Sequence, residues 1–87
     1  MKVILYGTNL CPFCRQANEL FEKNGVKADY REITEDLALF KEFLKLRDNS
    51  DKYADIKANG KVGVPTFVFE DGTITFDENE ALAELQR

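Results

Sequence analysis

The first third of the chain changes its hydrophobic period twice. Residues 2–6, KVILY, are a β-branched and aromatic run that predicts a short buried strand. From Pro12 the apolar residues recur at the spacing of one helical face as far as Phe21, and Gly25 suits a left-handed helix end. Residues 26–33 then alternate apolar and polar side chains, as in a strand. A strand, a helix and a strand in this order predict a right-handed βαβ unit with two parallel strands.

The second part of the chain predicts further helices and a hairpin. Apolar positions at helical spacing predict a second helix over 37–47, with a polar Thr-Glu-Asp sequence before it that can cap it. A shorter helical piece is expected over 53–60. Strand patterns at 66–69 and 73–76 flank an Asp-Gly turn, which is a strong hairpin signal.

A short helix is expected at the carboxyl end, from residue 78, where Asp77 and Glu80 have the spacing of a capping box. The complete order is therefore βαβ, a helix, and ββα. This order predicts an α/β fold with a four-stranded mixed sheet and helices on both faces. With 87 residues, the chain can bury enough surface for one modest core and one domain.

Composition and charge narrow the classes of partner. The net charge is −4, with 32% charged residues of both signs, which argues against nucleic acid and against an anionic membrane surface. The longest apolar runs are far too short to span a membrane. The amino-terminal residues enter a strand pattern without a cleavage site of small residues. A cytoplasmic monomer is therefore expected.

Both cysteines of the chain lie in one short stretch, NLCPFCR, at residues 9–15. Zinc usually takes four Cys or His ligands, and a chain with two thiols and no histidine would need a second chain to supply them, so no metal is expected. A structural disulfide between Cys11 and Cys14 would close almost no loop and would stabilise the fold little. An unreactive buried thiol fits Cys14 alone, since the spacing to Ala17 places it on the inner side of the helix.

A redox-active dithiol accounts for both cysteines together. Cys-x-x-Cys beside a βαβ pattern is typical of a thioredoxin-like site. Cys11 is expected at the start of a helix whose first residue, Pro12, suits that position. The free N–H groups and the positive end of the helix dipole stabilise a thiolate there, and Arg15 adds a positive charge. Because Cys14 lies one turn further and is expected to be buried, Cys11 is predicted to attack a disulfide and Cys14 to resolve the mixed disulfide.

A proline precedes the third predicted strand, in the sequence Gly63-Val64-Pro65-Thr66. Prolines commonly mark the start of a strand, and that is one interpretation. Beside a Cys-Pro-x-Cys helix in the same small chain, we instead interpret Pro65 as a cis-proline. The backbone of Val64 would then be unpaired next to the cysteines, where a peptide-like substrate can add as a short strand.

Two motifs together resemble those of the glutaredoxins, within the thioredoxin superfamily. They are LYGTNLCPFCRQA at 5–17 and GVPTFVFEDGTI at 63–74, and the order of elements is similar over essentially the whole chain, 1–87. The resemblance implies one thioredoxin-like domain and a thiol–disulfide oxidoreductase that draws on glutathione. Such an enzyme reduces protein disulfides or glutathione mixed disulfides, here with Cys11 as nucleophile and Cys14 as resolver. It also implies a substrate site that contains Thr8, Phe13, Val64, Pro65 and Asp77.

Three departures from the family pattern affect this site. Thr8 occupies the position of a typical lysine that helps to hold the thiolate and a glutathione carboxylate. The sequence Thr-Phe-Asp-Glu at 75–78 replaces a typical Gly-Gly sequence with a following Asp, so the carboxylates of glutathione would meet acidic side chains, although one acid can pair with its ammonium. The segment 37–63 is longer than usual. It indicates either a longer helical layer or substitute anchors for the substrate, namely Arg47, Lys57 and Lys61.

The pattern leaves three functions open. The Cys-Pro-Phe-Cys motif favours a glutathione-linked glutaredoxin. The departures at Thr8 and Phe76 favour a thioredoxin-like electron donor that is reduced by a flavoprotein reductase. A carrier of an iron–sulfur cluster, bridging two subunits through Cys11 and glutathione, is disfavoured because Pro12 tends to hinder that arrangement in the family.

Overall fold

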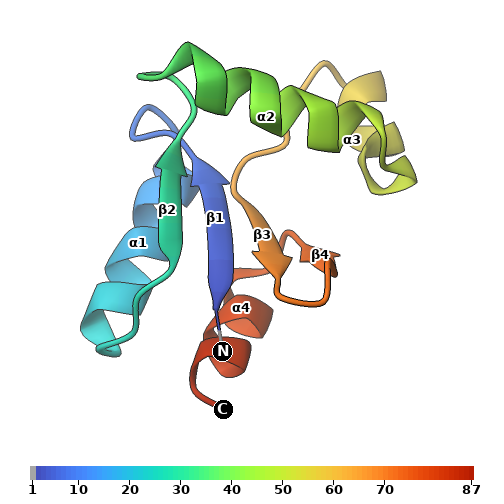
Figure 1. Cartoon of the computed structure of the whole chain (residues 1–87). Coiled ribbons are helices and arrows are strands. Elements are labelled where there is room, and N and C mark those ends of the chain that lie inside the picture. The colour runs from blue at the N-terminus through green and yellow to red at the C-terminus, as the bar shows by residue number, and fades with distance from the viewer. Residues whose placement is uncertain (1) are drawn as a thin grey trace.

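The computed structural model describes residues 2–87 and is organised around one mixed sheet (Figure 1). The strands lie in the order β2-β1-β3-β4, with β1 parallel to β2 and β3 antiparallel to both β1 and β4. The predicted α/β fold with a four-stranded mixed sheet is thereby confirmed. The strands are β1 (Val3–Gly7), β2 (Asp29–Glu32), β3 (Thr66–Phe69) and β4 (Ile74–Thr75).

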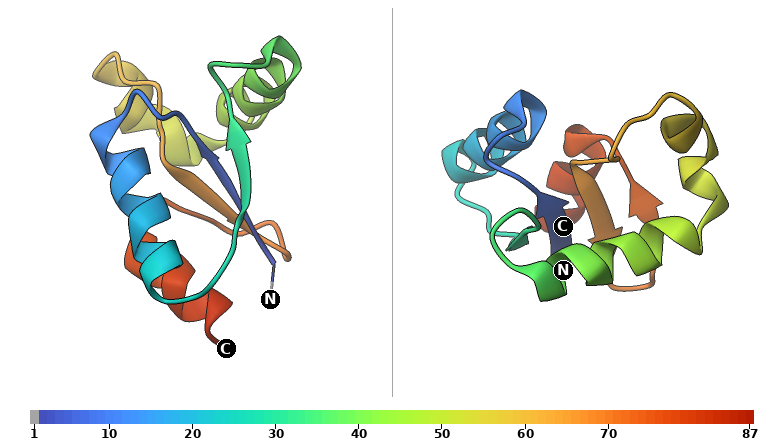
Figure 2. Two further views of the ribbon diagram at one scale, coloured as in Figure 1. Left: turned by 90° about the vertical axis from the view of Figure 1, so that its left-hand side faces the viewer. Right: turned by 90° about the horizontal axis from the view of Figure 1, so that it is seen from above.

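Helices cover both faces of this sheet (Figure 2). Helices α1 and α4 lie together on one face, α2 crosses the other, and η1 and α3 lead from α2 past the β4 edge. No helix within residues 2–87 is long and apolar enough to cross a membrane. The helices are α1 (Pro12–Lys23), α2 (Leu37–Asp48), the 3₁₀ helix η1 (Asp51–Tyr53), α3 (Ala54–Ala58) and α4 (Glu78–Leu85).

Alternation along β1 sends its side chains into two separate cores. Val3 and Leu5 point to the side of α1 and α4, whereas Tyr6 points to the side of α2. The first core consists of Val3, Leu5, Ala17, Phe21, Phe67 and Ala81, and the second of Tyr6, Ile33, Phe43 and Tyr53. Because both cores meet β1, they hold the loop that follows this strand from both sides of the sheet.

The second and fourth strands are shorter than the sequence pattern predicts. The N–H of Val26 donates to the carbonyl of Phe21 (3.0 Å), so this residue completes the end of α1 and β2 begins later. Strand β4 ends at Thr75. Phe76 lies beyond its end and packs its ring edge-on against Tyr53, with 5.1 Å between the ring centroids. Val26 and Phe76, which lie outside the observed strands, therefore make contacts that the periodicity does not encode.

The capping box predicted at the start of α4 forms in only one direction. Asp77 accepts a hydrogen bond from the N–H of Asn79 (2.8 Å), as an N-cap does. The second bond of the box, from the N–H of Asp77 to the Glu80 carboxylate, does not form, so this part of the prediction is wrong. The Glu80 carboxylate accepts instead from the hydroxyl of Thr75 (2.5 Å). The N–H of Asp77 donates to that same hydroxyl (3.2 Å). Thr75 thus stands between the two groups that a closed box would join.

Candidate active site

The two cysteines lie at the amino end of α1, where the chain leaves β1. Cys11 is the N-cap residue of this helix and Cys14 lies in its first turn. The two residues approach within 3.6 Å of each other, and both are free thiols. The loop before them is closed by a hydrogen bond from the N–H of Cys11 to the carbonyl of Thr8 (3.1 Å). The 3.6 Å between the two cysteines is short enough for them to form a disulfide after a small movement.

The two thiols differ in their surroundings. Cys11 is partly exposed, whereas Cys14 is fully buried. The pKa of Cys14 is raised to about 12, mainly by burial and also by Cys11 and Glu32, although a hydrogen bond with the Thr8 backbone acts in the opposite direction. Because only a thiolate is a good nucleophile, Cys14 stays protonated and unreactive at neutral pH while Cys11 faces outward.

Gly7 makes room for the buried thiol. A β-carbon at Gly7 would lie 3.1 Å from the sulfur of Cys14 and 3.3 Å from the ring of Tyr30. Any other residue at position 7 would therefore require Cys14 or Tyr30 to give way by a few tenths of an ångström, so the last residue of β1 shapes the site as well as the sheet.

The segment before β3 forms the wall opposite Cys11. The Val64–Pro65 peptide bond is cis, and the carbonyl of Val64 accepts a long hydrogen bond from the thiol of Cys11 (3.9 Å). Behind this wall the hydroxyl of Tyr53 contacts that of Thr66 (2.9 Å), which in turn donates to the carbonyl of Gly63 (2.5 Å). The buried Tyr53 therefore anchors the wall through two hydrogen bonds.

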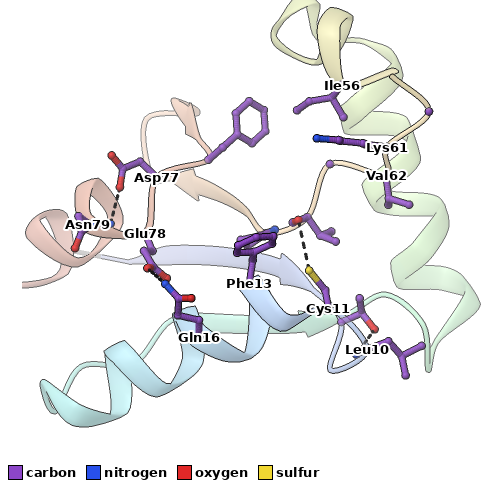
Figure 3. Close-up of a pocket in the computed structure, with 16 residues that line it drawn as sticks. Leu10, Cys11, Phe13, Gln16, Ile56, Lys61, Val62, Asp77, Glu78 and Asn79 are labelled. Atoms are coloured by element: carbon purple, nitrogen blue, oxygen red, sulfur yellow. Dashed lines mark hydrogen bonds between the residues drawn. The ribbon is translucent and has the colours of Figure 1, made fainter. Parts of the chain in front are cut away.

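A groove of about 740 Å³ opens in front of Cys11 (Figure 3). Phe13 and Gln16 of α1 line one side, while Ile56, Lys61 and Val62 approach from the side of α3. Of the residues predicted for the site, Cys14 lies behind the groove and does not line it. Those that do line it are Thr8, Cys11, Phe13, Val64, Pro65 and Asp77.

The substitute anchors suggested by the sequence are only partly in place. Lys61 lines the groove, whereas Arg47 and Lys57 are not among its lining residues. Thr8, at the position of the typical lysine, is buried, and its hydroxyl forms a hydrogen bond with that of Thr34 (2.8 Å). Within residues 2–87, no group of three or more His, Cys, Asp or Glu side chains is arranged to hold a metal ion.

Glu32 is a site residue that the sequence pattern did not reveal. Its carboxylate accepts hydrogen bonds from the N–H of Asn9 (2.9 Å), from the hydroxyl of Tyr30 (2.6 Å) and from the hydroxyl of Thr34. It thereby ties the end of β2 to the loop that carries Cys11. Its place at the carboxyl end of β2 could have indicated this role, because the carboxyl ends of neighbouring parallel strands meet at one edge of a sheet.

The hydrogen bonds to Glu32 also control its charge. Partial burial alone would raise the pKa of this carboxyl, but hydrogen bonds from Thr34, Tyr30, Thr8 and the Asn9 backbone outweigh it and lower the pKa to about 2. An ordinary glutamate has a pKa of about 4.3. The stability that Glu32 confers is therefore fully present above that ordinary value and is lost as the pH falls through about 2.

Glu32→Gln should therefore reduce the acid sensitivity of the fold. Above about pH 5 the variant should unfold with a free energy lower by about 1–3 kcal/mol, because charge-assisted hydrogen bonds are lost. The difference should shrink as the pH falls toward 2, since the wild-type carboxylate becomes protonated there. Urea unfolding at several pH values measures this. A constant difference at every pH would contradict the assigned role of the Glu32 charge.

Comparison with known proteins agrees with this arrangement. The family model for glutaredoxin matches residues 3–74, which include both cysteines, Val64 and Pro65. A protein of Haemophilus influenzae, described as an uncharacterized protein, is 33% identical over 76 residues, covering 87% of this chain and 88% of the relative. No solved structure matches the chain. Because the family model spans most of the chain, the chain belongs to the glutaredoxin family.

Proposed function

We propose that the protein is a disulfide reductase in which Cys11 attacks and Cys14 resolves. The observation that carries the proposal is the pairing of a partly exposed Cys11 at a helix start with a fully buried Cys14 within 3.6 Å. Cys11 lies at the amino end of α1, which is the positive end of the helix dipole. Cys14 is kept protonated by its burial until its partner has reacted.

The proposed reaction moves two electrons in two exchange steps. The Cys11 thiolate attacks one sulfur of the substrate disulfide, a mixed disulfide forms, and the other substrate sulfur leaves as a thiolate that takes up a proton. Cys14 then attacks the Cys11 sulfur, and the second substrate sulfur leaves as a thiolate that takes up the proton lost by Cys14. The protein ends with a Cys11–Cys14 disulfide, and the substrate ends with two thiols.

A reductant must then return two electrons to the protein. Glutathione is the first candidate, because glutaredoxins use it as their reductant. A flavoprotein reductase is the second, and two observations favour it. Thr8 is buried where the family typically has a lysine, and Asp77 and Glu78 both line the groove, where they would repel the carboxylates of glutathione.

Turnover with two reducing systems tests both parts of the proposal. A glutathionylated peptide is reduced either with glutathione and glutathione reductase or with thioredoxin reductase, each consuming NADPH. We expect turnover with glutathione, as in the rest of the family. Turnover with the flavoenzyme alone would make the second candidate correct. The absence of any exchange between the reduced protein and small disulfides would overturn the proposed function itself.

A further inference from the structure

Exposed apolar side chains gather around Cys11. Within residues 2–87 the large hydrophobic side chains that are exposed are Leu10, Phe13, Leu37, Val62 and Phe76. All of them except Leu37 line the groove in front of Cys11, and Leu10 and Phe13 are 75% and 68% exposed. Such a concentration of exposed apolar surface in one place marks an interaction site, whereas single exposed residues need no explanation.

The apolar residues lie on both sides of the reactive sulfur. Phe13 lies on the side of Cys11 that faces α4, whereas Leu10 and Val62 lie on the other side (Figure 3). Phe76 adds a further ring whose position is fixed by its edge-on contact with Tyr53. When a substrate cysteine reaches Cys11, the substrate residues before and after that cysteine would therefore both contact apolar protein surface.

Charge is divided between the two ends of the groove. Asp77 and Glu78 lie at the α4 end, and Lys61 lies on the α3 side (Figure 3). Both acids are held in place, since Asp77 caps α4 and Glu78 accepts a hydrogen bond from the side chain of Gln16 (2.7 Å). Glutathione carries two carboxylates and one ammonium. One acid can pair with the ammonium, but the α-carboxylate beside that ammonium would then lie against the second acid. A basic residue at the α4 end would match this arrangement well.

The backbone beside Cys11 is available to an extended chain. Val64 precedes the first paired residue of β3, Thr66, so it takes no part in the ladder between β3 and β1. Within the described residues 2–87, its carbonyl accepts only the long hydrogen bond from the Cys11 thiol. An extended segment can therefore run along residues 62–65. Its side chains would contact the apolar rim, which consists of Leu10, Phe13, Val62 and Phe76.

From these features we infer that the preferred substrate is an extended protein segment whose disulfide cysteine has large apolar residues on both sides and a basic residue toward Asp77 and Glu78. Glutathione disulfides are the poorer substrates of this groove. The inference rests on the proposed dithiol chemistry and concerns only the disulfide that is reduced, not the source of electrons.

Five disulfides presented to the fully reduced protein test the inference. Three are disulfide-linked dimers of the peptides Lys-Lys-Phe-Cys-Leu-Ser, Lys-Lys-Ser-Cys-Ser-Ser and Glu-Glu-Phe-Cys-Leu-Ser. The others are oxidised glutathione and bis(2-hydroxyethyl) disulfide. The single-turnover rate of each is measured by alkylation and mass spectrometry, and it is divided by the rate of the same disulfide with dithiothreitol. This division removes differences in the intrinsic reactivity of the disulfides.

The normalised rate should be highest for the peptide that is both apolar and basic. It should exceed the rates of the polar peptide and of oxidised glutathione by about tenfold or more, which corresponds to burying about one apolar side chain. Phe13→Ser and Val62→Ser should remove most of this preference. Leu37→Ser is the matched control, because Leu37 is equally apolar and exposed but lies outside the groove, and it should change nothing. Glu78→Gln should narrow the gap between the basic and the acidic apolar peptides.

Equal normalised rates for all five disulfides, or a highest rate with oxidised glutathione, would overturn the inference while leaving the proposed function intact. A failure to react even with bis(2-hydroxyethyl) disulfide would instead contradict the proposed function. An equal loss in Leu37→Ser and Phe13→Ser would show that general surface hydrophobicity, and not this groove, selects the substrate.

Discussion

Cys11→Ser should reduce disulfide reduction to the uncatalysed rate with every substrate and every reductant. The hydroxyl of serine is a far weaker nucleophile than a thiolate, and Cys14 cannot replace it, because it is fully buried and its pKa is raised by burial to about 12. The folded state should persist, since Cys11 is only partly buried and the hydrogen bond from its sulfur to the Val64 carbonyl is long (3.9 Å). Turnover assays together with circular dichroism measure the two effects separately.

Cys14→Ser is the matched variant, and it should stop the reaction halfway. The first exchange needs only Cys11, so the variant should accumulate a stable mixed disulfide whose mass equals that of the protein plus one substrate thiol. It should retain reduction of glutathione mixed disulfides, where a second glutathione can resolve the intermediate, and lose reduction of protein disulfides. Full protein disulfide reduction by Cys14→Ser, or retained turnover by Cys11→Ser, would show that the two roles are assigned wrongly.

Phe43→Ala should strongly destabilise the fold, although Phe43 lies outside the site. Phe43 is fully buried in the second core and packs against the rings of Tyr6 and Tyr53, with centroids 5.5 Å and 6.2 Å away. Truncating a buried aromatic side chain lowers the free energy of unfolding by about 3–5 kcal/mol. Small domains have only about 5–15 kcal/mol in total, so the midpoint of urea unfolding should fall markedly.

The same substitution should also affect the groove, because Phe43 supports Tyr53 and Tyr53 anchors the segment before β3. Leu37→Ala on the same helix is the control. Leu37 is exposed, so its truncation should change the free energy of unfolding by no more than about 0.5 kcal/mol. Similar losses in the two variants would mean that α2 is not packed on the sheet as the second core requires.

The fold could be predicted from the sequence because its determinants are local. The switch from strand to helix period at Pro12, the glycine after α1 and the Asp-Gly turn each act within a few residues. Their order then leaves few possible topologies. The predicted start of β2 is too early, because the alternating pattern does not show that the N–H of Val26 still bonds to the end of α1. The end of β4 could not be predicted, because it depends on the contact of Phe76 with Tyr53, which only folding brings together.

The site shows the same division between local and distant signals. Cys11, Cys14 and Pro65 belong to motifs that can be recognised in the sequence alone. Glu32 cannot be recognised in this way, because its role arises only when the pairing of β1 with β2 places it beside the loop that carries Cys11. Lys61 could not be distinguished from Arg47 and Lys57, since helical spacing does not specify how η1 and α3 turn toward the groove. The apolar rim was equally hidden, because its members come from three separate parts of the chain.

The hydrogen bonds from Tyr53 to Thr66 and from Thr66 to Gly63 have a consequence for how tightly substrates are held. They order the segment beside Cys11 before any substrate arrives, so the loss of conformational entropy on binding falls almost entirely on the incoming chain. Disulfides in stiff, already extended segments should therefore bind better than the same residues in flexible tails. The rigidity of the partner, and not only its sequence, becomes a criterion of selection.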